Sequence, residues 1–139
     1  MSPMDTDEPV RFVKVTPEGY GELIEIVADA FKDEFTGATR EQYVRSLTEG
    51  GDSSIWFIVY RGVRVGTFEI KTGNALASFN LTEGPGLFTF GIRTVYQLQG
   101  IGTKTLDKLV EQFGVLHVYG PSEASMSLYA KYPNILTHI

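Results

Sequence analysis

Residues 92–109, IRTVYQLQGIGTKTLDKL, lead from an apolar strand through a loop with two glycines into an amphipathic helix. A helix N-terminus presents N–H groups without partners inside the helix, together with the positive end of the helix dipole, and therefore favours phosphate. Gly100 and Gly102 would let a pyrophosphate approach the backbone, which a side chain at either position would prevent. The stretch predicts a pyrophosphate-binding turn between a strand and a helix.

Other phosphate motifs fit the same residues less well. A P-loop requires lysine directly after its second glycine, but Thr103 separates Gly102 from Lys104. A dinucleotide fingerprint requires a third glycine, and Thr105 occupies that position. A tight turn that binds no ligand would also use both glycines, so this alternative stays open.

The N-terminal part predicts one strand and two helices. Residues 10–15 alternate apolar and basic side chains, which is typical of a half-exposed strand. Thr16 and Pro17 then mark the start of a helix, with Thr16 as its N-cap. The apolar positions of this helix continue to Phe31. A second helix is predicted from Thr39, with Gln42 completing a capping box.

The middle of the chain predicts a hairpin and further strands. Residues 55–60 (IWFIVY) are too apolar for an edge strand and predict a central one. Residues 64–71 return with period-two alternation after a tight turn at Arg61 and Gly62. We also predict a short strand over residues 75–81, and another over residues 87–92 in which Gly91 indicates a bulge.

The C-terminal part adds two helices and two strands. A helix over residues 102–113 is ended by Gly114. A strand over residues 115–119, a helix over residues 122–132 before Pro133, and a final strand over residues 135–139 follow. Together the elements predict one mixed α/β domain over residues 10–139, after a flexible leader over residues 1–9.

The composition limits the function. The chain has a net charge of −5, no cysteine and two histidines. Without cysteine, disulfides, thiolate metal sites and a cysteine nucleophile are excluded, and with only His117 and His138 we expect no metal site. The sequence contains no basic cluster, so we do not expect non-specific nucleic-acid binding. The negative net charge instead favours a cationic amine as partner. The apolar runs are shorter than the about 20 residues of a membrane helix and the N-terminus is acidic, so we expect a cytoplasmic protein without membrane contact.

In the form Gln97-x-x-Gly100-x-Gly102, the loop resembles the coenzyme A loop of the GNAT superfamily of acyl-CoA-dependent N-acetyltransferases. The order of predicted strands and helices over residues 10–132 is similar to that of the family. Residues 127–131 (SLYAK) are similar to the family's Leu-Tyr-x-Lys segment. The resemblance implies a mostly antiparallel central sheet with helices on both faces, and acetyl-CoA as the acyl-donor cosubstrate.

The family's site residues are carried over by position. The resemblance implies that Ile92 and Thr94 pair with the pantetheine arm, and that the Ile92 N–H polarises the thioester carbonyl. Tyr129 corresponds to the family's tyrosine that donates a hydrogen bond to the departing thiolate. Lys104 and Lys108 are candidates for the adenosine phosphate, although a solvated helix face explains them equally well. The pyrophosphate would be held by Gln97, Gln99, Gly100, Ile101, Gly102 and Thr103.

The general base is open. Many family members have a glutamate on the strand before the coenzyme loop, but residues 86–89 contain no carboxylate. Glu69 is the best substitute, and an exposed ion pair with Lys71 is its alternative interpretation. His117 is a second candidate and is otherwise structural; a water-mediated base is the third option.

The chain also departs from the family pattern. Ser122 stands where the family often has asparagine, and the sequence ends at Ile139, before the usual closing pair of strands. We therefore expect a C-terminally shortened fold whose acceptor site is open, degenerate, or completed by another subunit in a homodimer. The function expected is direct acetyl transfer to a primary amine of a small molecule, peptide or base. The alternative is a catalytically inactive acyl-CoA-binding or assembly module.

Overall fold

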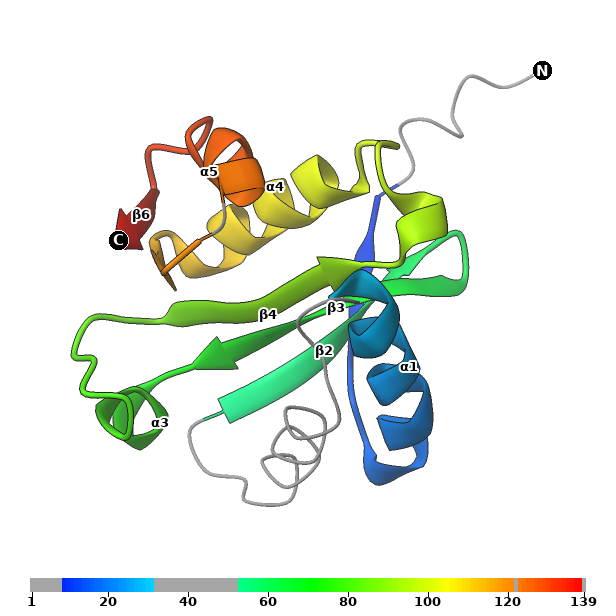
Figure 1. The fold of residues 1–139 in the computed structure, drawn as a ribbon, viewed down its shortest axis with the longest axis horizontal. Helices are drawn as coiled ribbons and strands as arrows, with labels where there is room; N and C mark the ends of the chain where they lie inside the picture. The colour runs from blue at the N-terminus through cyan, green and yellow to red at the C-terminus, as the bar shows by residue number, and fades with distance from the viewer. Residues whose placement is uncertain (1–8, 32–52, 122, 139) are drawn as a thin grey trace.

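The computed structural model describes residues 9–31, 53–121 and 123–138. Residues 1–8 of the predicted leader, the helix predicted from Thr39, and Ser122 at the start of the last predicted helix lie outside the described residues. Figure 1 shows the described elements as one layered arrangement of helices on a sheet.

The described strands form one six-stranded sheet in chain order. Neighbours from β1 to β4 run antiparallel, whereas β4 and β5, and β5 and β6, run parallel. This confirms the predicted mixed and mostly antiparallel α/β sheet. The strands are β1 (Arg11–Lys14), β2 (Ser53–Tyr60), β3 (Val63–Lys71), β4 (Gly86–Ile92), β5 (Leu116–Tyr119) and β6 (Ile135–His138).

The predicted hairpin of β2 and β3 is confirmed. Its two turn residues, Arg61 and Gly62, both have positive φ, at 53° and 77°, as a two-residue hairpin turn requires. Phe57 and Ile58 on β2 are fully buried and point to opposite faces of the sheet. The apolar run therefore forms a strand covered on both sides, as its composition predicted.

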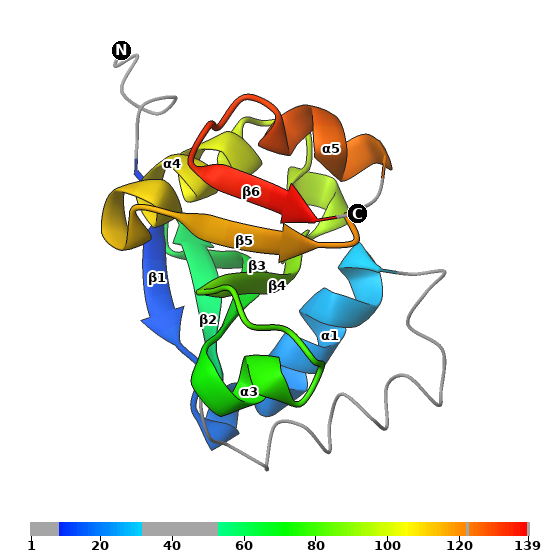
Figure 2. The same ribbon diagram turned by 90° about the vertical axis from the view of Figure 1, so that its left-hand side faces the viewer.

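Helices cover both faces of the sheet, as expected (Figure 2). On one face, α1 (Tyr20–Ala30) packs Leu23, Ile26 and Val27 against β2. On the other face, α4 (Ile101–Phe113) and α5 (Glu123–Tyr129) cover the main core, which contains Leu106 and Leu109. No helix in the described part of the chain is long and apolar enough to cross a membrane.

The predicted start of the first helix is wrong in detail. Residues Pro17–Gly19 form a 3-10 turn, η2, before α1 begins, and the Thr16 side chain makes no capping hydrogen bond. The Thr16 hydroxyl instead donates to Glu18, which lowers the pKa of that carboxyl. Gly19 packs tightly at this turn, because a Cβ there would lie 2.9 Å from the Phe57 ring.

The strand predicted over residues 75–81 is wrong. Residues Gly73–Ala77 form a short helix, α3, which begins with an Ala75 N–H bond to the Thr72 carbonyl. The alternating pattern resembled a strand, but alanine and leucine are also strong helix formers. Within α3 only Leu76 is buried, so a single helical turn suffices to bury it.

The C-terminal elements follow the predicted order. Gly114 ends α4 with φ of 77°, and its N–H bonds to the Val110 carbonyl at 2.8 Å. The helix α5 ends at Tyr129, three residues earlier than predicted, and turns continue to Pro133. The last strand, β6, pairs with β5 over four residues.

Candidate functional site

A bulge interrupts β4 before the loop that leads to α4. Phe88 pairs with Glu69 and Gly91 pairs with Thr67, so two residues of β4 stand opposite Phe68 alone. Thr89, one of these two, has φ of 49°. The extra residue increases the local twist and changes the direction of the strand that follows.

The bulge predicted at Gly91 therefore lies one to two residues earlier. Gly91 is glycine for another reason: a Cβ would lie 2.8 Å from both the Ala30 Cβ and the Phe31 ring. The close approach of α1 to β4 thus explains why residue 91 is glycine. The bulge is formed instead at Thr89, which has a positive φ.

The strands β4 and β5 are paired only at their start. Gly86 and His117 form the single register pair, and the His117 N–H donates to the Pro85 carbonyl at 2.9 Å. Beyond Gly86, β4 runs on toward the loop before α4, and among the described strands it is paired there with β3 alone (Figure 1). This part of β4 has one backbone edge that faces away from β3.

Ile92 presents its backbone at that edge. The neighbouring Arg93 N–H donates to the Val65 carbonyl of β3 at 2.8 Å. Because N–H groups alternate in direction along a strand, the Ile92 N–H points away from β3. Its carbonyl accepts from the Gln97 Nε2 at 2.9 Å. The Ile92 N–H thus lies on the edge of β4 away from β3, and the Gln97 side chain folds back onto β4.

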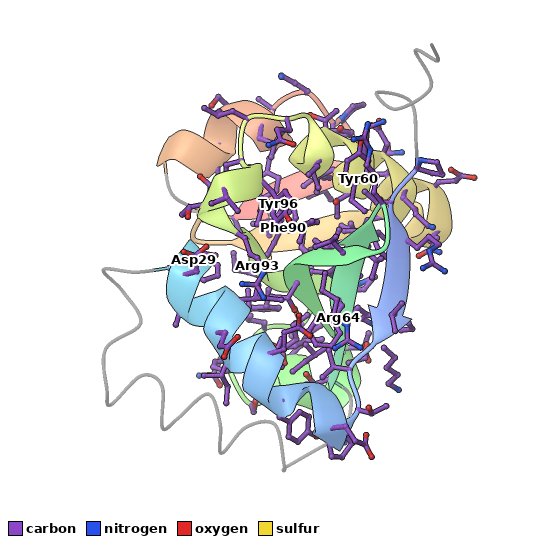
Figure 3. All side chains as sticks on the ribbon, turned by 90° about the vertical axis from the view of Figure 1, so that its right-hand side faces the viewer. Asp29, Tyr60, Arg64, Phe90, Arg93 and Tyr96 are labelled. Atoms are coloured by element: carbon purple, nitrogen blue, oxygen red, sulfur yellow. The ribbon has the colours of Figure 1, made fainter. Side chains whose placement is uncertain are left out.

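Thr94 lies in a 3-10 turn, η3 (Thr94–Tyr96), and does not extend the strand. Its N–H donates to Asp29 Oδ2 at 2.7 Å, and its hydroxyl to Asp29 Oδ1 at 3.1 Å. Thr94, which we predicted to pair with the pantetheine arm together with Ile92, thus has its N–H bonded to Asp29 in this conformation. Figure 3 shows Asp29 at the end of α1 close to Arg93 at the end of β4.

A charged contact also ties α1 to the end of β4. Glu22 accepts from Arg64 at 2.7 Å and lies 3.6 Å from Arg93. The Arg93 Nε donates to the Arg64 carbonyl at 3.2 Å. The sequence did not indicate that Glu22 and Asp29 contact the end of β4 and η3. These contacts depend on how α1 packs against residues more than sixty positions later in the chain, which no sequence pattern shows.

The N-terminus of α4 has open N–H groups. Gly100 is its N-cap, with φ of 80°, and no side chain caps the helix. The first backbone bond of the helix runs from the Lys104 N–H to the Gly100 carbonyl, at 3.0 Å. Within the described ranges, nothing accepts from the preceding N–H groups, those of Ile101, Gly102 and Thr103. Open N–H groups at a helix N-terminus are the feature that phosphate binding there would require.

The two glycines of the loop differ in what the fold requires of them. Gly100 adopts a positive φ, which favours glycine whatever surrounds it. Gly102 is helical, and a Cβ there would meet only the Leu128 side chain at 3.7 Å and the Phe90 ring at 4.0 Å. These are ordinary contacts, so the fold would accept alanine at position 102.

The last residue of α5 and the segment after it bring two tyrosines, Tyr129 and Tyr132, next to α4. The Tyr132 hydroxyl donates to Asp107 at 2.8 Å and to the Thr103 carbonyl at 3.1 Å. Tyr129 is buried, and burial raises the pKa of its phenol to about 12. No side chain or carbonyl in the described part of the chain bonds to its hydroxyl. Tyr129 is thus a protonated hydrogen-bond donor at neutral pH.

Glu69 lies on the other face of the sheet from Tyr129. It pairs across the strands with Ile55, which packs in the α1 cluster, whereas Tyr129 belongs to the α4 cluster. Its Oε2 accepts from Ser53 and from Lys71, the latter at 3.1 Å. The ion pair with Lys71 is therefore present but buried, and Oε1 has no partner among the described residues.

The lysines of α4 contact the protein itself. Lys108 Nζ donates to the Val10 carbonyl at 3.0 Å and lies 5.0 Å from the centre of the Phe12 ring. Lys104 Nζ lies 6.0 Å from the centre of the Tyr60 ring. Packing accounts for Lys108 better than a solvated helix face does, and neither lysine shows a contact that identifies an adenosine phosphate.

Solved structures provide the comparison. No family model matches the chain, and no curated protein matches it in sequence. A Pyrococcus horikoshii protein provisionally described as an acetyltransferase is 21% identical with a TM-score of 0.62, over 88% of this chain and 42% of its own length. The chain therefore spans less than half of that protein.

Two further neighbours are of similar length and contain the coenzyme. A predicted acetyltransferase of Clostridium acetobutylicum, solved with acetyl-CoA, is 15% identical with a TM-score of 0.60, over 89% of this chain and 88% of its own. The PaiA N-acetyltransferase of Thermoplasma acidophilum, solved with coenzyme A, is 18% identical with a TM-score of 0.56, over 88% and 87%. The chain therefore has the fold of the GNAT acetyltransferases, which is the fold that its glycine loop implied.

Proposed function

We propose that the protein is an N-acetyltransferase that moves an acetyl group from acetyl-CoA to a primary amine by direct attack. Gly102 is the observation that carries the proposal. The fold has room for a Cβ at this position, so packing does not explain the glycine. A ligand that approaches the backbone at the open N-terminus of α4 does explain it.

The residues at the loop fit a coenzyme A thioester. The N–H groups of residues 99–103 would hold the pyrophosphate, and the helix dipole adds positive potential without any basic side chain. The open edge of β4 would pair with the pantetheine arm through Ile92, which requires the Gln97 amide to leave the Ile92 carbonyl. Acetyl-CoA supplies an activated acyl group with a good leaving thiolate.

Three groups of the chain would serve the transfer. The Ile92 N–H would bond to the carbonyl oxygen on which negative charge develops. Tyr129, held neutral by its burial, would donate a hydrogen bond to the sulfur as the carbon–sulfur bond breaks. Glu69 lies on the other face of the sheet from Tyr129, so it would take a proton from the amine through a bridging water at its Oε1.

The acceptor that we propose is a primary amine that is protonated, and therefore cationic, before it reacts. The net charge of −5 raises the local concentration of small cations. The ammonium group would lose one proton to Glu69 and so become the nucleophile, and the second proton of the nitrogen would pass to the departing sulfur as the amide forms. Small molecules, peptides and bases with primary amines are the acceptors to be compared in an activity screen.

Calorimetric titration with acetyl-CoA tests the proposal. Gly102→Ala should weaken binding at least about tenfold, because the added methyl group occupies the pyrophosphate approach. Gly21→Ala is the matched control, since Gly21 is also the second residue of its helix and a Cβ there meets nothing within 4 Å. Equal affinity in the wild type and Gly102→Ala would refute the proposed loop.

A further inference from the structure

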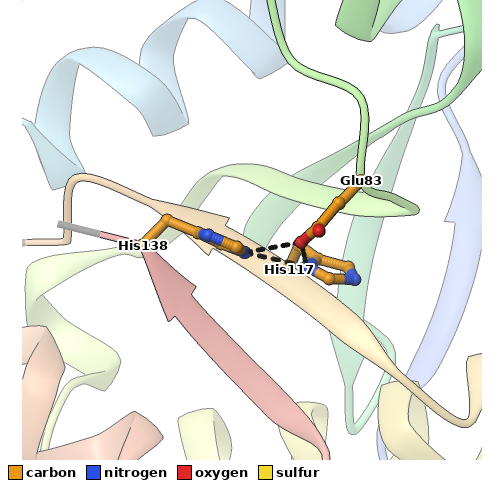
Figure 4. Close-up of side chains that lie close together, drawn as sticks. All are labelled: Glu83, His117 and His138. Carbon is orange, nitrogen blue, oxygen red and sulfur yellow. Dashed lines mark hydrogen bonds and ion pairs between the residues drawn. The ribbon is translucent and has the colours of Figure 1, made fainter.

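Three potential metal ligands meet at the start of β4, at the opposite end of that strand from Ile92. They are Glu83 from the loop before β4, His117 on β5 and His138 on β6 (Figure 4). His117 Nδ1 lies 2.9 Å from His138 Nε2. A Glu83 carboxylate oxygen lies 3.6 Å from the first nitrogen and 3.7 Å from the second.

The triangle formed by these three atoms has the size of a zinc ligand set. A point equidistant from all three lies about 2.0 Å from each, and zinc keeps roughly 2.0–2.2 Å from nitrogen and oxygen ligands. Two imidazoles and one carboxylate form a known zinc donor set that leaves a fourth position for water. The Glu83 side chain is 61% exposed, so an ion can enter from solvent.

The surroundings hold the ligands in place. His117 and Tyr119 lie on one face of β5, and Tyr119 is the register partner of His138. The Tyr119 ring stacks on the His138 ring, with centroids 4.5 Å apart, and its hydroxyl donates to the Glu83 carbonyl. Tyr119 therefore contacts the exposed Glu83 and the half-buried His138, while burial fixes His117. Such supporting contacts are typical of metal sites.

A proton shared between the two imidazoles is the simpler alternative. It accounts for the distance of 2.9 Å between the nitrogens, but it leaves the carboxylate beyond hydrogen-bond distance of both. A cation at the centre of the triangle satisfies all three ligand atoms at once. On this basis we propose that Glu83, His117 and His138 bind one Zn²⁺ ion.

The ion has a structural role. It joins the loop before β4 to β5 and to β6, the four-residue strand at the edge of the sheet. Glu83 lies near Gly86, and Gly86 and Ile92 are six residues apart on β4, which is about 20 Å along a strand. The ion is therefore distant from Ile92 and the coenzyme loop, whereas Glu69, the proposed base, pairs with Phe88 two residues from Gly86. This inference goes beyond the proposed function and does not depend on it.

Competition with a chromophoric chelator measures Zn²⁺ binding directly, without coenzyme. The wild type should bind one equivalent, and Glu83→Gln and His138→Gln should each weaken binding by at least roughly 10- to 100-fold. Glu111→Gln is the matched control, because it makes the same chemical change on the exposed face of α4 and should leave affinity unchanged. Zn²⁺ should also raise the wild-type melting temperature, because it binds only the folded arrangement.

Substitution with Co²⁺ provides a spectroscopic readout of the same ligands. Bound Co²⁺ should give visible absorption bands that disappear in Glu83→Gln and His138→Gln but persist in Glu111→Gln. Circular dichroism of each variant confirms that it is folded. Absence of Zn²⁺ binding by the wild type, or unchanged affinity in either ligand variant, overturns the proposal.

Discussion

The Tyr129 hydroxyl is a buried donor with no partner in the described ranges, and it lies on the helix that packs against the proposed coenzyme loop. We expect Tyr129→Phe to lower the acyl-transfer rate by about 10²- to 10³-fold, because the departing sulfur loses its hydrogen bond. Affinity for acetyl-CoA, measured by calorimetry, should stay the same. Single-turnover kinetics with a screened amine acceptor gives the rate.

Tyr132→Phe is the control for this substitution. The Tyr132 hydroxyl bonds to Thr103 and Asp107, so its loss should lower the free energy of unfolding by about 1 kcal/mol and leave the chemical step intact. An unchanged rate in Tyr129→Phe removes Tyr129 from the mechanism. Coenzyme binding without turnover by the wild type would favour the inactive binding module.

Glu69 is a base candidate whose Oε2 accepts two hydrogen bonds and whose Oε1 has no partner among the described residues. Glu69→Gln should lower the rate by about 10²- to 10⁴-fold while the affinity for acetyl-CoA is unchanged. A variant that keeps the wild-type rate would assign proton removal to water.

At the residue scale, the sequence allowed us to select candidate site residues that belong to one short motif. Gly100, Gly102 and Tyr129 each belong to a local pattern, and the structure places their elements together. Asp29 belongs to no pattern, because its role depends on how α1 packs against η3. The cluster of Glu83, His117 and His138 was missed, and with it the metal site that we now propose, because only the order of β4, β5 and β6 brings these residues together.

At the scale of elements, the contact between α1 and β4 positions the end of β4. Gly91→Ala should destabilise the protein by about 1–3 kcal/mol, since its Cβ would lie 2.8 Å from Ala30 and Phe31. Gly21→Ala, in open space on α1, should instead stabilise the protein by up to about 1 kcal/mol. Urea unfolding measures both. Equal stability of Gly91→Ala and the wild type would show that α1 moves away without cost.

Among the helices and strands, the long ones were easier to predict from the sequence than the short ones. The hairpin of β2 and β3 was predicted because its strands are long, apolar and joined by a clear turn. The short helix α3 was mistaken for a strand, because a few alternating residues satisfy both patterns. The position of the bulge at Thr89 could not be predicted, since it arises from the pairing of β4 with β3 and not from a residue that prefers positive φ.

For the molecule as a whole, the raised pKa values of two tyrosines lead us to expect that the free energy of unfolding decreases at alkaline pH. Burial raises the pKa of Tyr129 to about 12, and burial together with the neighbouring Asp107 raises that of Tyr132 to about 12. In the unfolded chain both titrate near pH 10. The folded state therefore holds these protons more tightly, and the free energy of unfolding decreases as the pH rises from about 10 to 12.

Urea unfolding between pH 9 and 12 measures this effect. The decrease should be shallower in Tyr129→Phe than in the wild type, because one of the two raised groups is absent. Below pH 10 neither tyrosine contributes to the slope, so the pH dependence of the two proteins should agree there. An identical decrease in both proteins above pH 10 would contradict the assignment.

The central claim is that a coenzyme A thioester binds at the start of α4 and along the end of β4. Titration of ¹⁵N-labelled protein with acetyl-CoA, followed in two-dimensional amide spectra, tests it most directly. We predict saturable shifts that are largest at the N–H groups of Ile92 and residues 99–103, with little change at Gly21. Shifts centred elsewhere, or none at millimolar acetyl-CoA, would contradict the account.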